Sequence, residues 1–169
     1  ISTMGSFTTT QQWLAANGYA VYVLNPRGAH TYGQDFAARH GNDWGVKSPA
    51  DVGEGVEALL AAHPELDRDR IGCYGGSYGG FMTMSLLTQT DMFAAGVSMY
   101  GISNLASYWG EGIWGYTYGD MAMADSYPWN RPDLYADRSP LYHADAVEQQ
   151  QGCRHGVGVV KGRPVGVEV

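Results

Sequence analysis

The stretch IGCYGGSYGGFM, residues 71–82, places a single serine, Ser77, between two pairs of glycines. The residues just before it, 70–74, favour a buried strand, and residues 81–87 favour a buried helix. Residues 75–79 fit G-x-S-x-G, in which the serine occupies a strained strand-to-helix turn that only glycine neighbours leave room for. The stretch therefore predicts a nucleophile. The alternative is a glycine-rich turn that only permits close packing or binds a phosphate at the helix N-terminus.

Helix and strand patterns alternate around this stretch. Residues 11–17 carry helix formers, and residues 19–24 form an apolar run typical of a buried strand. A second helix is expected to begin at Ser48 as N-cap and to end before Pro64, and residues 94–99 predict a further strand. This order predicts an α/β fold, a parallel sheet with helices on both faces.

Three segments lack a regular pattern. Residues 25–34 are punctuated by Pro and Gly and predict a loop. The aromatic stretch YWGEGIWGYTY, residues 108–118, is too irregular to predict a helix, so we expect a loop that covers a core edge or lines a pocket. Residues 149–169 are Gly/Val-rich without defensible strand order. We therefore divide the chain into a partial α/β domain, 1–148, and a divergent, weakly specified tail, 149–169.

Composition excludes several classes of function. The chain has 169 residues, a hydrophobic content of 44% and a net charge of -7, so it can bury a core but offers no basic face for nucleic acid or an anionic membrane surface. No apolar run is long enough to span a bilayer, and no signal peptide opens the sequence. Cys73 and Cys153 give neither a disulfide framework nor a metal site, so no metal or cofactor is expected.

The catalytic partners of Ser77 are harder to find. A serine hydroxyl needs a histidine to take its proton and a carboxylate to orient that histidine, and in this arrangement both follow the serine in the chain. The histidines after Ser77 are His143, for which a structural role is expected, and His155, which lies in the irregular tail. Neither is assigned as the base.

Several motifs together resemble one family. They are NGYAVYVLNPRGAHTYGQDF (17–36), DWG (43–45), DRIGCYGGSYGGFMT (69–83) and SPLYHAD (139–145). In this order they resemble the catalytic domain of the prolyl oligopeptidase family of serine peptidases, above all its dipeptidyl peptidase IV and acylaminoacyl peptidase branches. The resemblance covers roughly residues 8–146 and is more specific than the serine motif alone.

The resemblance implies a partial α/β-hydrolase fold that follows an N-terminal β-propeller in the parent protein, and cleavage of short peptides through an acyl-enzyme. It implies Ser77 as the nucleophile and the backbone N–H of Tyr78 as an oxyanion donor. Tyr108 and Trp109 correspond to the pocket for the residue that precedes the scissile bond. For Arg27, a structural ion pair is favoured over substrate contact.

The departures from the family indicate a fragment. The family's oxyanion-assisting segment would precede Ile1, no aspartate follows Asp145, and the chain stops before the place of the triad histidine. We expect the isolated chain to be inactive. Two alternatives stay open: an esterase or lipase-type hydrolase, and a non-catalytic α/β domain that binds a ligand or partner through its aromatic residues. A soluble protein of the cytoplasm or periplasm is expected.

Overall fold

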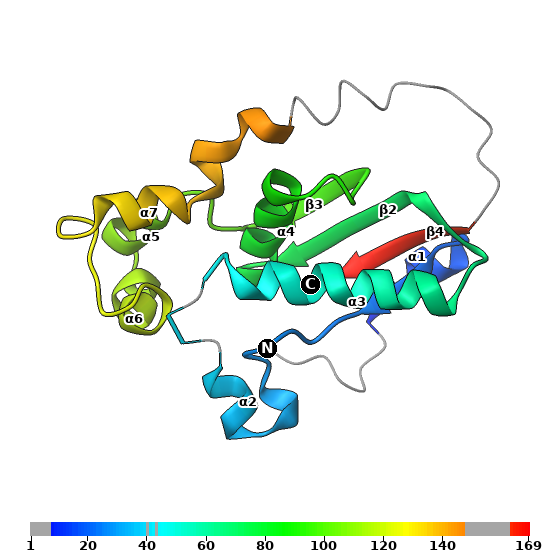
Figure 1. Cartoon of the computed structure of the whole chain (residues 1–169), viewed down its shortest axis with the longest axis horizontal. Helices are drawn as coiled ribbons and strands as arrows, with labels where there is room; N and C mark the ends of the chain where they lie inside the picture. Colours follow the sequence, from blue (N-terminus) through cyan, green and yellow to red (C-terminus); the bar gives the residue numbers. More distant parts are fainter. Residues whose placement is uncertain (1–7, 40, 43, 148–162) are drawn as a thin grey trace.

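The computed structural model describes residues 8–39, 41, 42, 44–147 and 163–169. Its centre is a four-stranded, fully parallel sheet in the order β1-β4-β2-β3 (Figure 1). The strands are β1 (Ala20–Val23), β2 (Leu66–Gly76), β3 (Ala95–Met99) and β4 (Arg163–Glu168). The architecture is a partial α/β-hydrolase fold, as the sequence predicts.

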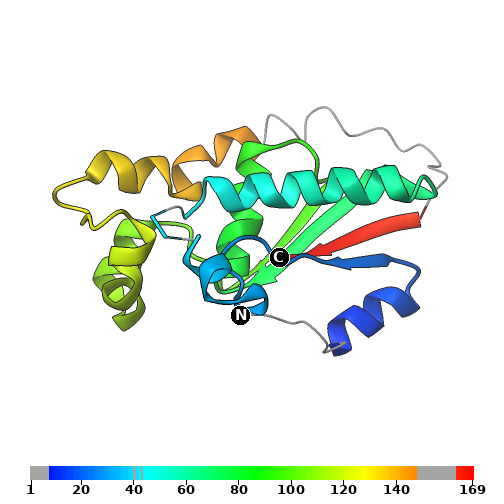
Figure 2. The same ribbon diagram turned by 60° about the horizontal axis from the view of Figure 1, so that its bottom comes forward.

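Helices cover both faces of the sheet. Helix α3 (Lys47–Ala62) lies on one face and α1 (Thr9–Ala16) on the other (Figure 2). Helix α4 (Tyr78–Gln89) begins directly after Ser77 and contacts β2, β3 and α3. Both crossovers, through α3 and through α4, join parallel strands, and this connection requires a helix on a sheet face.

The remaining elements are short. The 3-10 turn η1 (His30–Tyr32) and α2 (Gln34–Ala38) follow β1. Helices α5 (Leu105–Glu111), α6 (Ile113–Ala122) and α7 (Pro132–Asp137) gather at one end of the sheet, and the 3-10 turn η2 (Pro140–His143) leads back from them (Figure 1).

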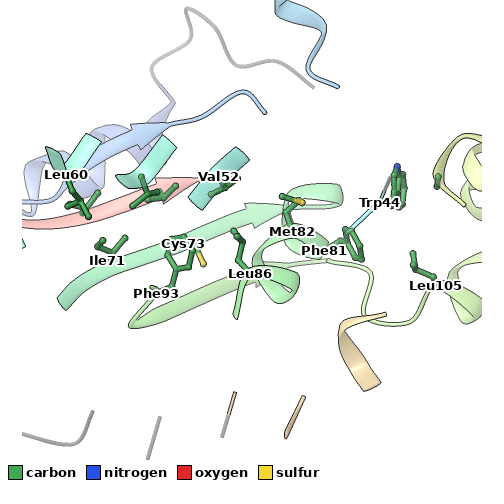
Figure 3. Packing of buried hydrophobic residues seen from close by; sticks show 14 of the residues in the cluster. Trp44, Val52, Leu60, Ile71, Cys73, Phe81, Met82, Leu86, Phe93 and Leu105 are labelled. Carbon is green, nitrogen blue, oxygen red and sulfur yellow. The ribbon is translucent and has the colours of Figure 1, made fainter. Parts of the chain in front are cut away.

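The core lies between the sheet and the α3–α4 layer (Figure 3). Alternate residues of β2, Ile71 and Cys73, point into it, as do Val165 and Val167 of β4. The helices contribute apolar residues at helical spacing, and the buried set is Val52, Val56 and Leu60 of α3 with Phe81, Met82 and Leu86 of α4. Burial of this apolar surface is the main favourable contribution to folding.

The opposite face of β4 carries a polar contact. The Glu168 carboxylate accepts hydrogen bonds from the Tyr74 hydroxyl at 2.8 Å and from the Gln11 side-chain amide at 2.5 Å. These residues come from β4, β2 and α1, so the bonds tie the strand to its neighbour and to the helix beneath it. Burial and the bond to Glu168 raise the pKa of Tyr74, which therefore remains a hydrogen-bond donor.

Three expectations are corrected by the structure. The stretch 108–118 is helical, in α5 and α6, and not a loop. Ser48 is not an N-cap: α3 begins at Lys47, and Ser48 is fully buried. The last part of the expected tail is a strand in the interior of the sheet, although residues 149–162 lie outside the described residues.

The loop predicted over residues 25–34 contains η1, and the first residue of α2 falls at its end. The other strands and helices lie where the sequence places them, within a few residues at their ends.

The interior position of β4 gives a stability prediction. Val167 of β4 is 0% exposed, whereas Val97 of β3 is 59% exposed. We expect Val167→Ala to lower the free energy of unfolding by about 2 kcal/mol, because it removes buried methyl groups and leaves a cavity. The matched change Val97→Ala should alter it by less than about 0.5 kcal/mol. Urea denaturation followed by circular dichroism measures both; equal effects would contradict the placement of β4.

Candidate active site

Ser77 occupies the turn between β2 and α4. Its backbone has φ 58° and ψ -116°, a conformation that is strained for a residue with a Cβ, and its side chain is exposed. The Ser77 N–H donates to the Met99 carbonyl at the end of β3, at 3.0 Å. The predicted strand–serine–helix geometry is confirmed.

Glycines make room for this turn. A Cβ on Gly76 would lie 2.6 Å from the Tyr100 hydroxyl oxygen, and one on Gly80 would lie 2.7 Å from Gly101 Cα. A Cβ on Gly79 would collide with the Val169 carbonyl. These glycines are thus required by contacts with two neighbouring segments of chain, the one after β3 and the one after β4.

Aromatic rings connect the turn to the helices at the end of the sheet. The buried Trp44 ring lies 4.9 Å from that of Tyr78, edge to face, and 6.1 Å from that of Tyr108. Tyr78 and Tyr108 are both half-buried. The residue after Ser77 and the expected pocket tyrosine therefore share one aromatic neighbour, Trp44 of the DWG motif.

The SPLYHAD motif and the residue before it anchor the same region. The Arg138 guanidinium donates to the Trp44 carbonyl at 3.1 Å. The fully buried Ser139 hydroxyl accepts from the Leu105 N–H at 2.9 Å and donates to the Tyr135 carbonyl at 2.5 Å, so it joins the start of α5 to α7. Sequence reasoning identified the motif but not this role of Arg138 and Ser139.

Trp109 belongs to a separate aromatic group. Its ring meets that of Trp129 edge to face at 4.7 Å, and the rings of Tyr127 and Trp129 stack at 4.7 Å. Trp109 and Tyr108 also line a small apolar cavity together with Trp44 and Met123. The structure thus places the two expected pocket residues beside each other, on α5.

The described residues do not supply a base for Ser77. Within them, no side chain forms a hydrogen bond with the Ser77 hydroxyl. The exposed His143 donates from Nε2 to the Asp137 carbonyl at 2.8 Å, in agreement with the expected structural role. His155 lies outside the described residues.

Other chemistries find little support in the described part of the chain. Burial raises the pKa of the Cys73 thiol to about 12, so this free cysteine stays protonated. Its possible bridge partner, Cys153, lies outside the described residues. No group of His, Cys, Asp and Glu there could bind a metal ion, and none of the described helices is long and apolar enough to cross a membrane.

Arg27 forms the structural ion pair expected from the sequence. Its Nε donates to Asp51 Oδ2 at 2.7 Å and its Nη2 to Oδ1 at 2.5 Å, and its backbone N–H also reaches Oδ2. The Arg27 side-chain hydrogen bonds hold the pKa of Asp51 below its ordinary value. The pair joins the loop after β1 to α3 and borders an open cleft that contains none of the predicted substrate-binding residues.

Comparisons with known proteins identify relatives of this chain. The model of the prolyl oligopeptidase family matches residues 5–156. The uncharacterized peptidase YuxL of Bacillus subtilis is 41% identical over 145 residues, which cover 86% of this chain and 22% of that protein. Dipeptidyl aminopeptidase BIII of Pseudoxanthomonas mexicana is 34% identical over 143 residues, 82% of this chain and 21% of that protein.

A solved structure shares the fold. The acylaminoacyl peptidase of Pyrococcus horikoshii superposes with a TM-score of 0.68 at 28% identity, over 85% of this chain and 26% of that one. The chain therefore spans about a fifth to a quarter of the length of these relatives.

The strain at Ser77 predicts a stabilising substitution. Glycine adopts positive φ without a Cβ penalty, so Ser77→Gly should raise the free energy of unfolding by about 1 kcal/mol and Tm by roughly 2–4 °C. Ser77→Ala keeps the Cβ and should leave Tm nearly unchanged. Differential scanning calorimetry of the three proteins checks this; a Tm that falls in the glycine variant would show that the turn is not strained.

The Arg27–Asp51 pair predicts a pH dependence. Because the folded pKa of Asp51 lies below its ordinary value of 3.8, the pair's contribution is fully present above that value and is lost as pH falls through the lowered one. Asp51→Asn should lower the free energy of unfolding by about 1 kcal/mol at neutral pH, and the difference should shrink toward about pH 2. Urea denaturation across this range measures it. The exposed pair Arg131–Asp133 offers a control, since Asp133→Asn should have a smaller effect at every pH.

Proposed function

Because the chain belongs to the prolyl oligopeptidase family, we propose that it is part of a serine peptidase in which Ser77 is the nucleophile. The Ser77 Oγ attacks the scissile carbonyl and forms a C–O bond; the amide C–N bond breaks, and the departing amine nitrogen takes up the proton that the Ser77 hydroxyl loses. The acyl-enzyme is then hydrolysed by water. The substrates are short peptides.

The observation that carries this proposal is the conformation of Ser77. An exposed serine in a strained backbone conformation, between a parallel strand and a helix, is the arrangement that lifts a hydroxyl above the sheet of an α/β-hydrolase. A turn that served only for close packing would favour glycine at this position, because the side chain gains no burial there.

Tyr78 and the α5 aromatics receive the roles that the family implies. Tyr78 directly follows Ser77 and is the first residue of α4, so we assign its backbone N–H as an oxyanion donor. Tyr108 and Trp109 are assigned to the pocket of the residue before the scissile bond. The support for Tyr108 is its contact with the Trp44 ring, which also contacts Tyr78.

The base and acid of the triad are not assigned to any residue of this chain. The relatives are much longer, and we propose that the parent protein supplies further elements, among them the β-propeller that the family resemblance implies. The division of the sequence at residue 148 stays a prediction about the origin of its last segment, which the coding DNA around Glu148 would test.

Two measurements on the isolated chain test the proposal. A serine-directed fluorophosphonate probe should label Ser77 slowly, at a rate that rises with pH and shows no plateau near neutrality, because no described histidine takes the proton. Turnover of a chromogenic Xaa-Pro or N-acyl-aminoacyl substrate should stay within the residual range of roughly 10³–10⁴ over water that an incomplete triad leaves.

Control variants separate the outcomes. Ser77→Ala should abolish labelling, whereas Ser107→Ala, at an exposed serine of α5, should leave it unchanged. Labelling that survives in Ser77→Ala would overturn the assignment of the nucleophile. Fast turnover abolished by Ser77→Ala would show instead that the chain does contain a base.

A further inference from the structure

Tyr100, the first residue after β3, has an unusual backbone and side chain. Its φ is 43°, in the left-handed region that is disfavoured for a residue with a Cβ, and its side chain is 81% exposed. The sequence patterns that identified Ser77 gave no signal for it.

Contacts on both sides fix the backbone of Tyr100. The preceding residue, Met99, accepts the hydrogen bond from the Ser77 N–H. The following residue, Gly101, packs against Gly80 in the first turn of α4, and the Ser98 hydroxyl donates to the Gly80 carbonyl at 3.1 Å. Tyr100 is therefore held in place by the same turn and helix that position the nucleophile.

The Tyr100 ring lies next to the nucleophile turn. Its hydroxyl oxygen would be 2.6 Å, and its nearest ring carbons 2.9 Å, from a Cβ on Gly76, the residue before Ser77. Because β2 and β3 are parallel neighbours, the residues that follow them emerge at the same edge of the sheet. The phenol ring thus stands beside Gly76, the residue that precedes the exposed Ser77.

The packing of Tyr100 itself does not explain this arrangement. The side chain is outside the hydrophobic core cluster, and among the described residues it forms no hydrogen bond. Strained residues persist where the surroundings fix them, and they concentrate at functional sites. A large aromatic side chain held in a strained conformation with little burial has surface free for a ligand.

We propose that Tyr100 is a substrate-contacting, specificity-determining residue, whose ring packs against the acyl half of the substrate and favours an aromatic or large apolar side chain there. This inference rests on the proposed role of Ser77 as nucleophile. Tyr100 and Tyr108 both follow β3, which borders β2 on the side away from β4, and the proposal assigns both rings to the same half of a bound substrate. Aromatic side chains gain most from such a contact.

Activated esters can acylate a serine without a general base, so they test the proposal on the isolated chain. The p-nitrophenyl esters of N-acetyl-phenylalanine and N-acetyl-glycine differ in the acyl side chain; attack forms the Ser77 ester, and p-nitrophenolate leaves as the proton passes to solvent base. Peptide mapping by mass spectrometry gives the rate of adduct formation at Ser77 for each ester. We expect the phenylalanine-to-glycine rate ratio to fall about five-fold in Tyr100→Ala.

Two matched variants serve as controls for this experiment. Tyr100→Phe keeps the ring and should keep the ratio, and Tyr142→Ala, at an exposed tyrosine of η2, should keep it too. An unchanged ratio in Tyr100→Ala, with Ser77 still acylated, overturns the role of Tyr100 and leaves the nucleophile standing. An absence of Ser77 adduct in every protein overturns the nucleophile and this inference together.

Discussion

Two close backbone approaches at the start of α4 set the geometry of the site. Gly79 lies against the Val169 carbonyl at the end of β4, and Gly80 lies against Gly101 just beyond β3. Any side chain at either position would push the helix away from a strand. The helix must begin here for Ser77 to occupy its turn, so the absence of two Cβ atoms determines where the hydroxyl stands.

The same constraint explains why the neighbours of Ser77 are so well fixed. The Ser77 N–H is bonded to β3, the Ser98 hydroxyl is bonded to α4, and Trp44 packs against Tyr78 and Phe81 of α4. Arg138 in turn binds the Trp44 carbonyl. The proposed nucleophile is thus positioned by rigid elements, and such a nucleophile needs little reorganisation when substrate binds, which is the condition for efficient attack.

The fold around Ser77 could be predicted because its signals are local. The β-branched and apolar runs of β1 and β2 and the glycine-flanked serine need only neighbouring residues for their interpretation. Their order also gave the family resemblance, and with it the α/β-hydrolase fold.

The helices α5 and α6 were not predicted from the aromatic stretch 108–118, because its glycines look like helix breakers. Gly115 of α6 packs against the backbone of Tyr108 and Trp109 in α5, where a Cβ would lie 2.7 Å from the Trp109 N. The close contact between α5 and α6 thus requires a glycine at position 115, which sequence alone does not reveal. The Asn104 side chain, which accepts from the N–H groups of Ala106 and Ser107, was the cap signal that could have located α5.

The strand β4 was missed for a different reason, and it matters most for the site. Residues 163–168, RPVGVE, do alternate valine with glycine and glutamate, but proline and glycine weaken the pattern, and nothing local indicates an interior position. In the structure β1 and β2 are not bonded to each other, and β4 joins them.

A shift of β4 by one residue would turn Glu168 toward the α3–α4 core and the valines toward α1. The bonds from Gln11 and Tyr74 to Glu168 oppose that shift. Because the register of β4 also decides where the Val169 carbonyl meets Gly79, these polar bonds on the far face of the sheet help to position the turn that carries Ser77.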